Sequence, residues 1–450
     1  MMSVVLQSSS GWVLESRSLI DRGYERCVRW TGHQKSHVKC SFKSFQTVKS
    51  HYNLSGRAAV DGEHTDVMQK TDKPSKKRKR KHNELNQGEI DAKAFHEKIR
   101  SVILEGTKSL VDSARSAGYL SGETETFRDP LPSQDCSLAA LCEMAKDLPL
   151  MADEEQEWTQ SLFTKEGCVS HVDLFSQVTE NTEAWAAVVS LIGEEFIIPP
   201  KTAFLLSDFT RIQPLVQSGR RFDLIVIDPP WENKSVKRSR RYSSLPSSQL
   251  KRLPVPLLGS PGCLVVTWVT NRPSHLRFVR DELYPHWGVE VVAEWFWVKV
   301  TTWGEFVFPL DSPHKKPYEV LVLGRYRPTN GHTSPLQMPS VPVEDKRLIV
   351  SVPSALHSQK PLLSEVLKSY IGAEAKCLEL FARNLQPGWT SWGNEVLKFQ
   401  HISYFNLDPV DISKAEAAKD DTYNPAVTCD FSSPKKTDCL HPAFLTSEQQ

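Results

Sequence analysis

The chain has 450 residues, and its 55 Lys and Arg residues nearly balance 54 Asp and Glu residues, which gives a formal net charge of +1 at pH 7. This balance excludes a uniformly basic nucleic-acid-binding protein, so any such surface must be local. The nine cysteines are scattered and include no Cys-x-x-Cys pair, which is typical of reduced thiols in an intracellular protein. No apolar run approaches the length of a membrane span and the N-terminus lacks a signal-peptide pattern, so we expect no membrane partner.

Residues 1–60 contain short apolar fragments that can form some strands, and we interpret them as an N-terminal extension. Cys27, His33, His37 and Cys40 have spacings that a zinc ion can use. The segment lacks a second Cys-x-x-Cys or His-x-x-x-His pattern, so a loop-rich extension without metal is favoured. A metal-binding chromatin module is the alternative.

Residues 61–88 are polar and charged without a hydrophobic period, which predicts a disordered basic linker. Six consecutive Lys and Arg residues occupy 76–81, just after Lys73 and Pro74. This run favours a nuclear import signal read by an import receptor, and hence a nuclear protein that can also be found in the cytoplasm. A nucleic-acid-binding arm and a solvated charge run are the alternatives.

Residues 89–195 are predicted to form a helical domain. Apolar residues recur at spacings of three to four from Ile90 to Leu110, and Gly118 can end this helix. A second helix is expected from Asp135 to Met144, and further helices at 155–163 and 172–192. We expect this domain to pack on the catalytic domain or to guide substrate.

The apolar run 222–227 predicts a short buried strand that ends in Asp228-Pro229-Pro230-Trp231. Because proline lacks an N–H and fixes φ, the carboxylate and the aromatic ring are presented rigidly at the carboxyl edge of the sheet, where ligands bind. An exocyclic amine on a base is a poor nucleophile. Asp228 and the Pro229 carbonyl can activate it as hydrogen-bond acceptors, and Trp231 can stack on the base. A tight turn whose tryptophan fills the core is the alternative.

A basic loop follows this tetrapeptide. Five of the eight residues from Lys234 to Arg241 are Lys or Arg, and Tyr242 closes the run. Basic side chains beside an aromatic ring suit a phosphate backbone with an unstacked base, although a solvated surface loop is also compatible. The predicted substrate-binding residues here are Asn233, Lys234, Lys237, Arg238, Arg240, Arg241 and Tyr242.

Strand-like and helical segments alternate from 196 to 405, which predicts an α/β domain with a parallel-type sheet covered by helices on both faces. Strands are expected at 203–206, 263–269, 289–300, 319–323, 348–352, 377–381 and 388–391. The loop 301–317 is long enough to form a lid. The absence of a Gly-x-Gly-x-x-Gly turn argues against a dinucleotide, and the polar segment 406–450 is expected to be a disordered tail.

Three separated motifs resemble one family. Asp-Pro-Pro-Trp at 228–231, the segment 312–319 and the segment 378–395 are similar to the adenine-N6 methyltransferases related to the catalytic subunit of the mRNA adenosine methyltransferase, especially the methyltransferase-like protein 4 branch. The resemblance covers about 196–400. It implies a Rossmann-like S-adenosylmethionine-dependent methyltransferase sheet with a permuted motif order, because the tetrapeptide precedes the motif at 379–384.

The resemblance also implies the cofactor site. Asp208 and Phe209 match the adenine-binding pair, Lys360 matches the carboxylate-binding lysine, and Asp228 can face the methionine ammonium. The ribose-contacting set matches Glu379, Arg383 and Asn384, and the pair that closes over adenine and ribose matches Asn394 and Glu395. Two departures stand out: Asn384 follows Arg383 without the family's intervening histidine, and Glu395 replaces a glutamine.

The substrate pocket is implied in the same way. Trp231, Tyr242, Trp268 and Trp297 match aromatic or adjacent positions of the base pocket, and Lys299 matches its polar wall. His314, Lys316 and Glu319 match a second active-site loop. Because Trp268 and Trp297 lie on expected strands, core packing is an equal alternative.

The resemblance implies N6 methylation of adenine in nucleic acid, without a metal. The suspected substrates are adenosine in RNA, including 2′-O-methyladenosine in small nuclear RNA, and adenine in DNA. The rival is a catalytically silent RNA-binding or scaffold subunit. The intact tetrapeptide favours a catalytic chain that does not depend on an inactive partner.

Overall fold

Strand β10 (Phe222–Ile227) lies inside a twelve-stranded sheet in the computed structural model. The structure describes residues 3–31, 34–43, 45, 86–122, 137–150, 157–164, 171–232, 245–313, 315–328 and 341–409. These residues belong to one compact unit, Met1–Pro409. Among the residues in these ranges, no helix is both long enough and apolar enough to cross a membrane.

The sheet has the strand order β1-β2-β14-β12-β13-β11-β10-β15-β16-β9-β6-β5. Its strands, in chain order, are β1 (Val4–Ser8), β2 (Gly11–Leu14), β5 (Thr159–Ser161), β6 (Val178–Asn181), β9 (Thr202–Leu206), β10, β11 (Gly259–Val269), β12 (Val289–Lys299), β13 (Tyr318–Tyr326), β14 (Leu348–Ser351), β15 (Cys377–Leu380) and β16 (Trp389–Gly393).

The part of this sheet that positions the site is parallel. β10 pairs in parallel with β11 and β15, and β15, β16 and β9 continue in the same direction. Only β13, among the strands next to β11 and β12, runs antiparallel to both of them. The chain therefore leaves β9, β10, β15 and β16 at a common edge, where ligands bind in open α/β sheets.

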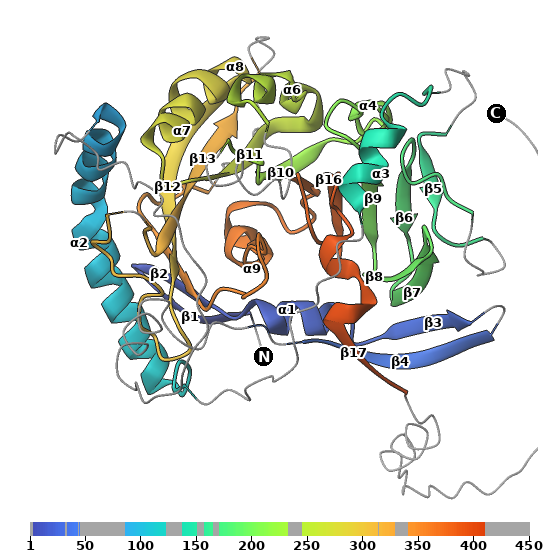
Figure 1. The fold of residues 1–450 in the computed structure, drawn as a ribbon, viewed down its shortest axis with the longest axis horizontal. Helices are drawn as coiled ribbons and strands as arrows, with labels where there is room; N and C mark the ends of the chain where they lie inside the picture. Colours follow the sequence, from blue (N-terminus) through green and yellow to red (C-terminus); the bar gives the residue numbers. More distant parts are fainter. Residues whose placement is uncertain are drawn as a thin grey trace, which may run out of the picture. The chain divides into compact units, whose positions relative to one another are not determined.

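Both faces of the sheet are covered (Figure 1). Ile225 and Ile227 of β10 face one hydrophobic cluster, whereas Leu224 and Val226 face the other, as the two-residue period of a strand requires. The helices that contribute to the first cluster are α2 (Gln87–Ser116), α4 (Gln213–Gln217), α6 (Val255–Leu258), α7 (Pro273–Arg277) and α8 (Tyr284–His286), with the π-helical turn η2 (Phe278–Leu283) and the 3-10 turn η1 (Ser247–Arg252). Helix α9 (Ser364–Leu367) and the following turn η3 (Lys368–Tyr370) pack on the second. The predicted α/β class with helices on both faces is confirmed.

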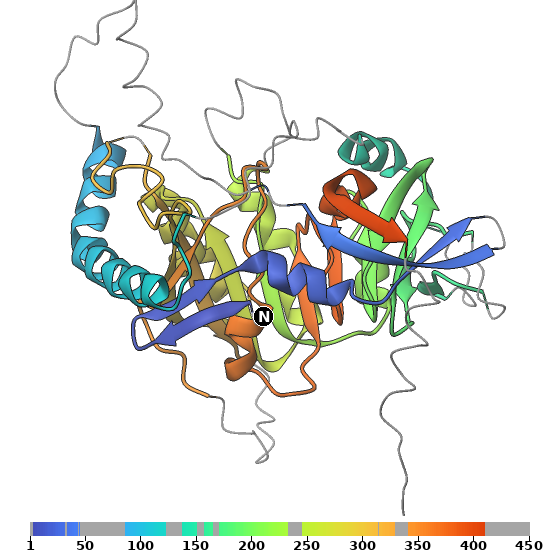
Figure 2. The same ribbon diagram turned by 90° about the horizontal axis from the view of Figure 1, so that it is seen from below.

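A second sheet of five strands has the order β17-β4-β3-β7-β8. Its strands are β3 (Cys27–Thr31), β4 (Gln34–Phe42), β7 (Ala186–Leu191), β8 (Glu194–Ile198) and β17 (Phe405–Pro409). Helix α1 (Ser16–Gly23) joins β2 of the large sheet to β3 of the small one, as the blue segment in Figure 2 shows. The turns η4 (Lys398–Gln400) and η5 (Ile402–Tyr404) precede β17.

The strands expected in the first 60 residues are confirmed, but they are integral to both sheets. β2 adds to β14 in parallel, with Ile349 opposite Trp12. β17 pairs with β4 as far as Pro409, so residues 406–409 belong to a strand and not to the expected tail. Residues 46–85, with the basic run at 76–81, and residues 410–450 lie outside the described residues.

The segment 89–195, expected to be a helical domain, contains helices in its first part and strands in its second. Helix α2 begins with a capping box between Asn86 and Glu89, and α3 (Leu138–Ala145) is also helical. The helices expected at 155–163 and 172–192 are wrong, because these segments contain β5, β6 and β7. Five of the six residues of β7 are buried, so its apolar run belongs to a strand covered on both faces and not to one helical stripe.

Candidate active site

The turn after β10 is held by backbone hydrogen bonds. The N–H of Asp228 donates to the Leu380 carbonyl of the neighbouring strand at 3.2 Å, and the N–H of Trp231 donates to the Pro229 carbonyl at 2.8 Å. The Leu245 N–H donates to the Pro230 carbonyl at 3.0 Å. Because the prolines fix φ and supply no N–H, these contacts leave the tetrapeptide little freedom.

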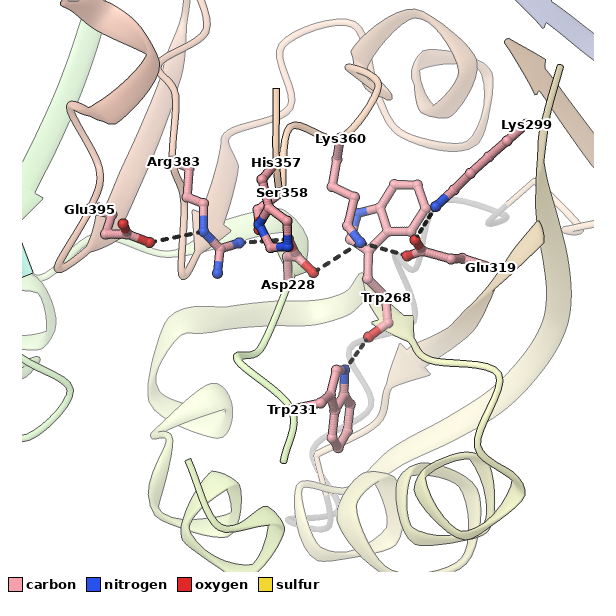
Figure 3. A network of polar contacts seen from close by, with 10 residues as sticks. All are labelled: Asp228, Trp231, Trp268, Lys299, Glu319, His357, Ser358, Lys360, Arg383 and Glu395. Atoms are coloured by element: carbon pink, nitrogen blue, oxygen red, sulfur yellow. Dashed lines mark hydrogen bonds and ion pairs between the residues drawn. The ribbon is translucent and has the colours of Figure 1, made fainter. Parts of the chain in front are cut away.

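Asp228 is buried and lies between two cations (Figure 3). Nη1 of Arg383 donates to its Oδ2 at 2.9 Å, and Nζ of Lys360 lies 3.5 Å from its Oδ1. The carboxylate thus lies against two positively charged side chains, which fix its oxygens as hydrogen-bond acceptors in the wall of the site.

These contacts belong to a row of seven alternating charges: Lys398, Glu395, Arg383, Asp228, Lys360, Glu319 and Lys299. Arg383 uses Nε for Glu395 at 3.1 Å, and Lys360 reaches Oε2 of Glu319 at 2.6 Å. Each interior charge therefore has an opposite charge on both sides, which offsets the cost of removing it from water.

Two pKa values in this row are set by burial and by the neighbouring charged side chains. Burial raises the pKa of Glu319, but the ammonium groups of Lys360 and Lys299 outweigh it and lower that pKa to about 2. Burial opposes the charged form of Lys360, and the carboxylates of Asp228 and Glu319 reverse this effect and raise its pKa. In both Glu319 and Lys360, the neighbouring opposite charges therefore favour the charged form over the neutral one.

Two cavities meet at the tetrapeptide. Cavity A, of about 290 Å³, is lined by the predicted cofactor residues Asp208, Phe209, Arg383, Asn394 and Glu395. Cavity B, of about 460 Å³, is lined by Asp228, Pro229, Trp231, Lys316, Glu319 and Lys360. Pro230 and Arg383 line both, so a ligand in one cavity lies next to a ligand in the other.

The aromatic wall of cavity A comes from two turns. The ring of Phe209, after β9, is stacked on that of Phe381, after β15, with centroids 6.3 Å apart. Oδ1 of Asp208 accepts hydrogen bonds from the backbone and the hydroxyl of Thr210, at 2.9 and 2.8 Å, which orients the carboxylate.

Trp231 has one edge fixed and one face covered. Its Nε1 donates to the Trp268 carbonyl at 2.8 Å, and its ring is stacked on His275 with centroids 4.7 Å apart. Burial lowers the pKa of His275 to about 4, so this imidazole is neutral at physiological pH. The tryptophan ring is therefore a rigid part of the wall of cavity B.

The structure does not bring Trp268 and Trp297 to cavity B. Both are buried in the cluster on the α9 face of the sheet, where their rings meet edge to face at 5.5 Å. Nζ of Lys360 lies 5.0 Å from the Trp268 centroid, and Nζ of Lys299 lies 4.4 Å from that of Trp297. The two rings thus support the cations of the charged row.

Glu379 and Asn384 also lie away from both cavities. They line a small pocket of about 10 Å³ with Lys360 and Gln386. Burial raises the pKa of Glu379 to about 7, and the hydrogen bond from Gln386 partly opposes this shift.

Several predicted residues lie outside the described residues: Asn233, Lys234, Lys237, Arg238, Arg240, Arg241, Tyr242, His314 and His33. Of the proposed zinc ligands, Cys27 and Cys40 are buried in the cluster between the small sheet and the turns before β17. Within the described ranges, no group of three His, Cys, Asp or Glu side chains is placed to hold a metal ion.

Sequence reasoning missed three contributors to the site. His275 covers the Trp231 ring, and Ala92 and Phe95 of α2 line cavity B. The helical period of α2 placed Phe95 on its apolar face, but nothing local indicated which cavity that face would meet.

Comparison with known proteins identifies the family to which the chain belongs. A family model described as MT-A70 matches residues 222–395. The chain is 52% identical over 351 residues to N(6)-adenine-specific methyltransferase METTL4 of Mus musculus, which covers 76% of this chain and 74% of that protein. It is 54% identical to the METTL4 of Homo sapiens (71% and 69% covered), and 36% identical to the N6-methyladenosine RNA methyltransferase MTA1 of Pyricularia oryzae (46% and 56% covered). The chain therefore belongs to the MT-A70 family of methyltransferases and is similar to its METTL4 members.

Proposed function

We propose that this protein transfers the methyl group of S-adenosylmethionine to the N6 amine of adenine in RNA. The observation that carries the proposal is the position of Asp228, whose carboxylate lies in the wall of cavity B and is joined to cavity A through Arg383. The METTL4 relatives are named as N(6)-adenine-specific methyltransferases and the MTA1 relative as an RNA methyltransferase, which supports the proposal.

The residues of cavity A fit the cofactor. Phe209 offers an aromatic face to adenine, and the Asp208 carboxylate and the Asn394 amide offer hydrogen bonds to adenine and ribose. At the junction with cavity B, the Lys360 ammonium can take a carboxylate and Asp228 an ammonium. When bound, the cofactor supplies an electrophilic methyl group on a sulfonium.

The protein's part in the reaction is to orient the amine. The Asp228 carboxylate and the Pro229 carbonyl accept its two N–H groups, which draws the nitrogen towards tetrahedral geometry and frees its lone pair. The Pro229 carbonyl is already aimed by the Trp231 N–H at 2.8 Å. Held in this way, the amine nitrogen would be free to take the methyl group that the cofactor would supply, with the sulfur–carbon bond breaking as the nitrogen–carbon bond forms, and the amine would lose one proton to solvent.

We also extend three sequence predictions as proposals. The motif order is permuted, which is supported by β10 preceding its neighbour β15 in the chain. The basic run at 76–81 carries the protein into the nucleus, and replacing its six basic residues by Ala should leave a fluorescent fusion in the cytoplasm. The chain acts without an inactive partner subunit, so the purified chain alone should methylate.

One assay tests the function and the substrate. The purified chain is incubated with S-adenosylmethionine and single-stranded DNA, unmodified RNA or 2′-O-methylated RNA, and the nucleosides are analysed by mass spectrometry. We expect N6-methylated adenosine from RNA, and none with Asp228→Ala. Equal product from this variant, or no product from any nucleic acid, would reject the proposal, whereas product from DNA alone would reject RNA as the substrate.

A further inference from the structure

One wall of cavity B comes from outside the segment that matches the MT-A70 family. Ala92 and Phe95 line this cavity together with Asp228 and Trp231, although they belong to helix α2 and precede the matched segment 222–395 by more than one hundred residues. In Figure 1, α2 lies at the side of the sheet next to β12 and β13. The helix is therefore part of the site.

A buried histidine fixes α2 in this position. His96 is 3% exposed, and its two ring nitrogens lie 3.0 Å from the Tyr318 hydroxyl and 3.0 Å from Oδ1 of Asp311. Its ring is nearly parallel to that of Tyr318, which begins β13. Because His96 directly follows Phe95, these contacts fix the part of the α2 backbone that carries Phe95 at cavity B.

The same helix also holds the loop 301–317. Nε and Nη2 of Arg100 donate hydrogen bonds of 2.8 Å to the two carboxylate oxygens of Asp311, which is the bidentate geometry typical of an arginine–carboxylate pair. This loop contributes Phe308, Lys315 and Lys316 to cavity B. Helix and loop thus form one wall, with Asp311 as their shared contact.

The composition of this wall suits a nucleotide. Phe95 is only half-buried, whereas His96 and Ile99 on the same helical face are buried. Nζ of Lys315 lies 5.2 Å from the Phe308 ring centroid, so a positive charge and an aromatic ring lie together. A flat base or ribose can cover the Phe95 ring and a phosphate can meet the lysine.

We infer that Phe95 contacts the target nucleotide, and that His96 and Asp311 are positioning residues that hold this wall. The inference rests on the proposed methyltransferase activity. It assigns part of substrate recognition to α2, outside the matched methyltransferase segment.

The test compares Phe95→Ala with a matched control on the same helix. Val102→Ala also truncates a partly buried side chain packed on the same core, but Val102 is not among the residues that line cavity B. We expect Phe95→Ala to raise KM for an adenine-containing RNA about tenfold and leave the cofactor Kd unchanged. Phe95→Tyr should keep KM for RNA close to the wild-type value. Asp311→Asn should raise KM for RNA by less than about tenfold and should change kcat by a smaller factor than KM.

The outcomes separate the two claims. If the wild type methylates RNA and Phe95→Ala has the same KM as Val102→Ala, the inference is wrong and the proposed function stands. If the wild type methylates no nucleic acid, both are wrong. Should Phe95→Ala lose cofactor binding because it unfolds, Phe95→Leu replaces it, and a KM for RNA in that folded variant equal to that of Val102→Ala overturns the inference.

Discussion

Nη1 of Arg383 lies 2.9 Å from Oδ2 of Asp228, while Nε of the same guanidinium lies 3.1 Å from Oε2 of Glu395. One side chain from the turn after β15 therefore joins the carboxylate of the tetrapeptide to the carboxylate that follows β16. Both ligand cavities meet at this arginine.

Arg383 cannot be replaced by lysine without loss, because one ammonium does not reach two carboxylates with the spacing of a guanidinium. We expect Arg383→Lys to lower kcat/KM at least tenfold. We expect Arg383→Met to lower the unfolding free energy by about 3 kcal/mol, since the buried carboxylate of Asp228 and the partly buried carboxylate of Glu395 both lose a partner. Urea unfolding and methylation kinetics measure these effects.

The matched control is Arg327→Met, because Arg327 pairs with Glu290 at an exposed position where each side chain is 62% exposed. Arg327→Met should lower the unfolding free energy by no more than about 1 kcal/mol. If both Met variants lost the same unfolding free energy, the two ion pairs of Arg383 would contribute no more to stability than one exposed pair.

Trp231→Phe removes one buried hydrogen bond and keeps an aromatic ring beside His275. The Trp268 carbonyl then loses the donor at 2.8 Å, which should lower the unfolding free energy by about 1–3 kcal/mol. Denaturant titration measures the change. A variant as stable as the wild type would mean that solvent replaces the indole N–H.

Glu379→Gln should change how stability depends on pH. The pKa of Glu379 is raised from 4.5 to about 7 by burial, so the unfolded chain releases this proton at lower pH than the folded one. The wild type therefore loses stability relative to the variant as pH rises from about 4.5 to 7, by about 3 kcal/mol in total, and the difference is constant above about pH 8. Urea unfolding of both proteins across this range checks the sign, and a pH-independent difference would contradict it.

The basic run from Lys234 to Arg241 is expected to bind the RNA backbone. Replacing Lys237, Arg238, Arg240 and Arg241 by Gln or Ser should weaken RNA binding and reduce the dependence of log Kd on log salt, because fewer counterions are released. Fluorescence anisotropy at several salt concentrations measures both quantities. An unchanged affinity and slope would place RNA entry elsewhere.

The sequence predicts the site best where a local pattern has one physical meaning. The apolar run of β10 ending in two prolines predicts both the buried strand and the rigid turn. Trp297 and Lys299, two residues apart on β12, share one side of the strand, and the Lys299 ammonium lies 4.4 Å from the Trp297 ring centroid. These features depend on neighbours in the chain.

Features that depend on distant segments are not predicted. β7 reads as a helix because a continuous apolar run has no period that distinguishes it from a buried helix. Glu319 joins Lys299 to Lys360, and Phe95 reaches cavity B, only through the packing of separate elements. Trp268 resembles a base-pocket residue, yet its place on β11 turns it towards the face covered by α9.

The pairing of β2 with β14 has a consequence for synthesis of the protein. The ribosome makes Gly11–Leu14 first, yet their partner Leu348–Ser351 is translated more than three hundred residues later. A shortened transcript that begins beyond Leu14 would leave the backbone donors and acceptors of β14 open along a new sheet margin, which invites pairing with other nascent chains. Strand β2 therefore covers the edge of β14, and we expect aggregation to be the first effect of its loss.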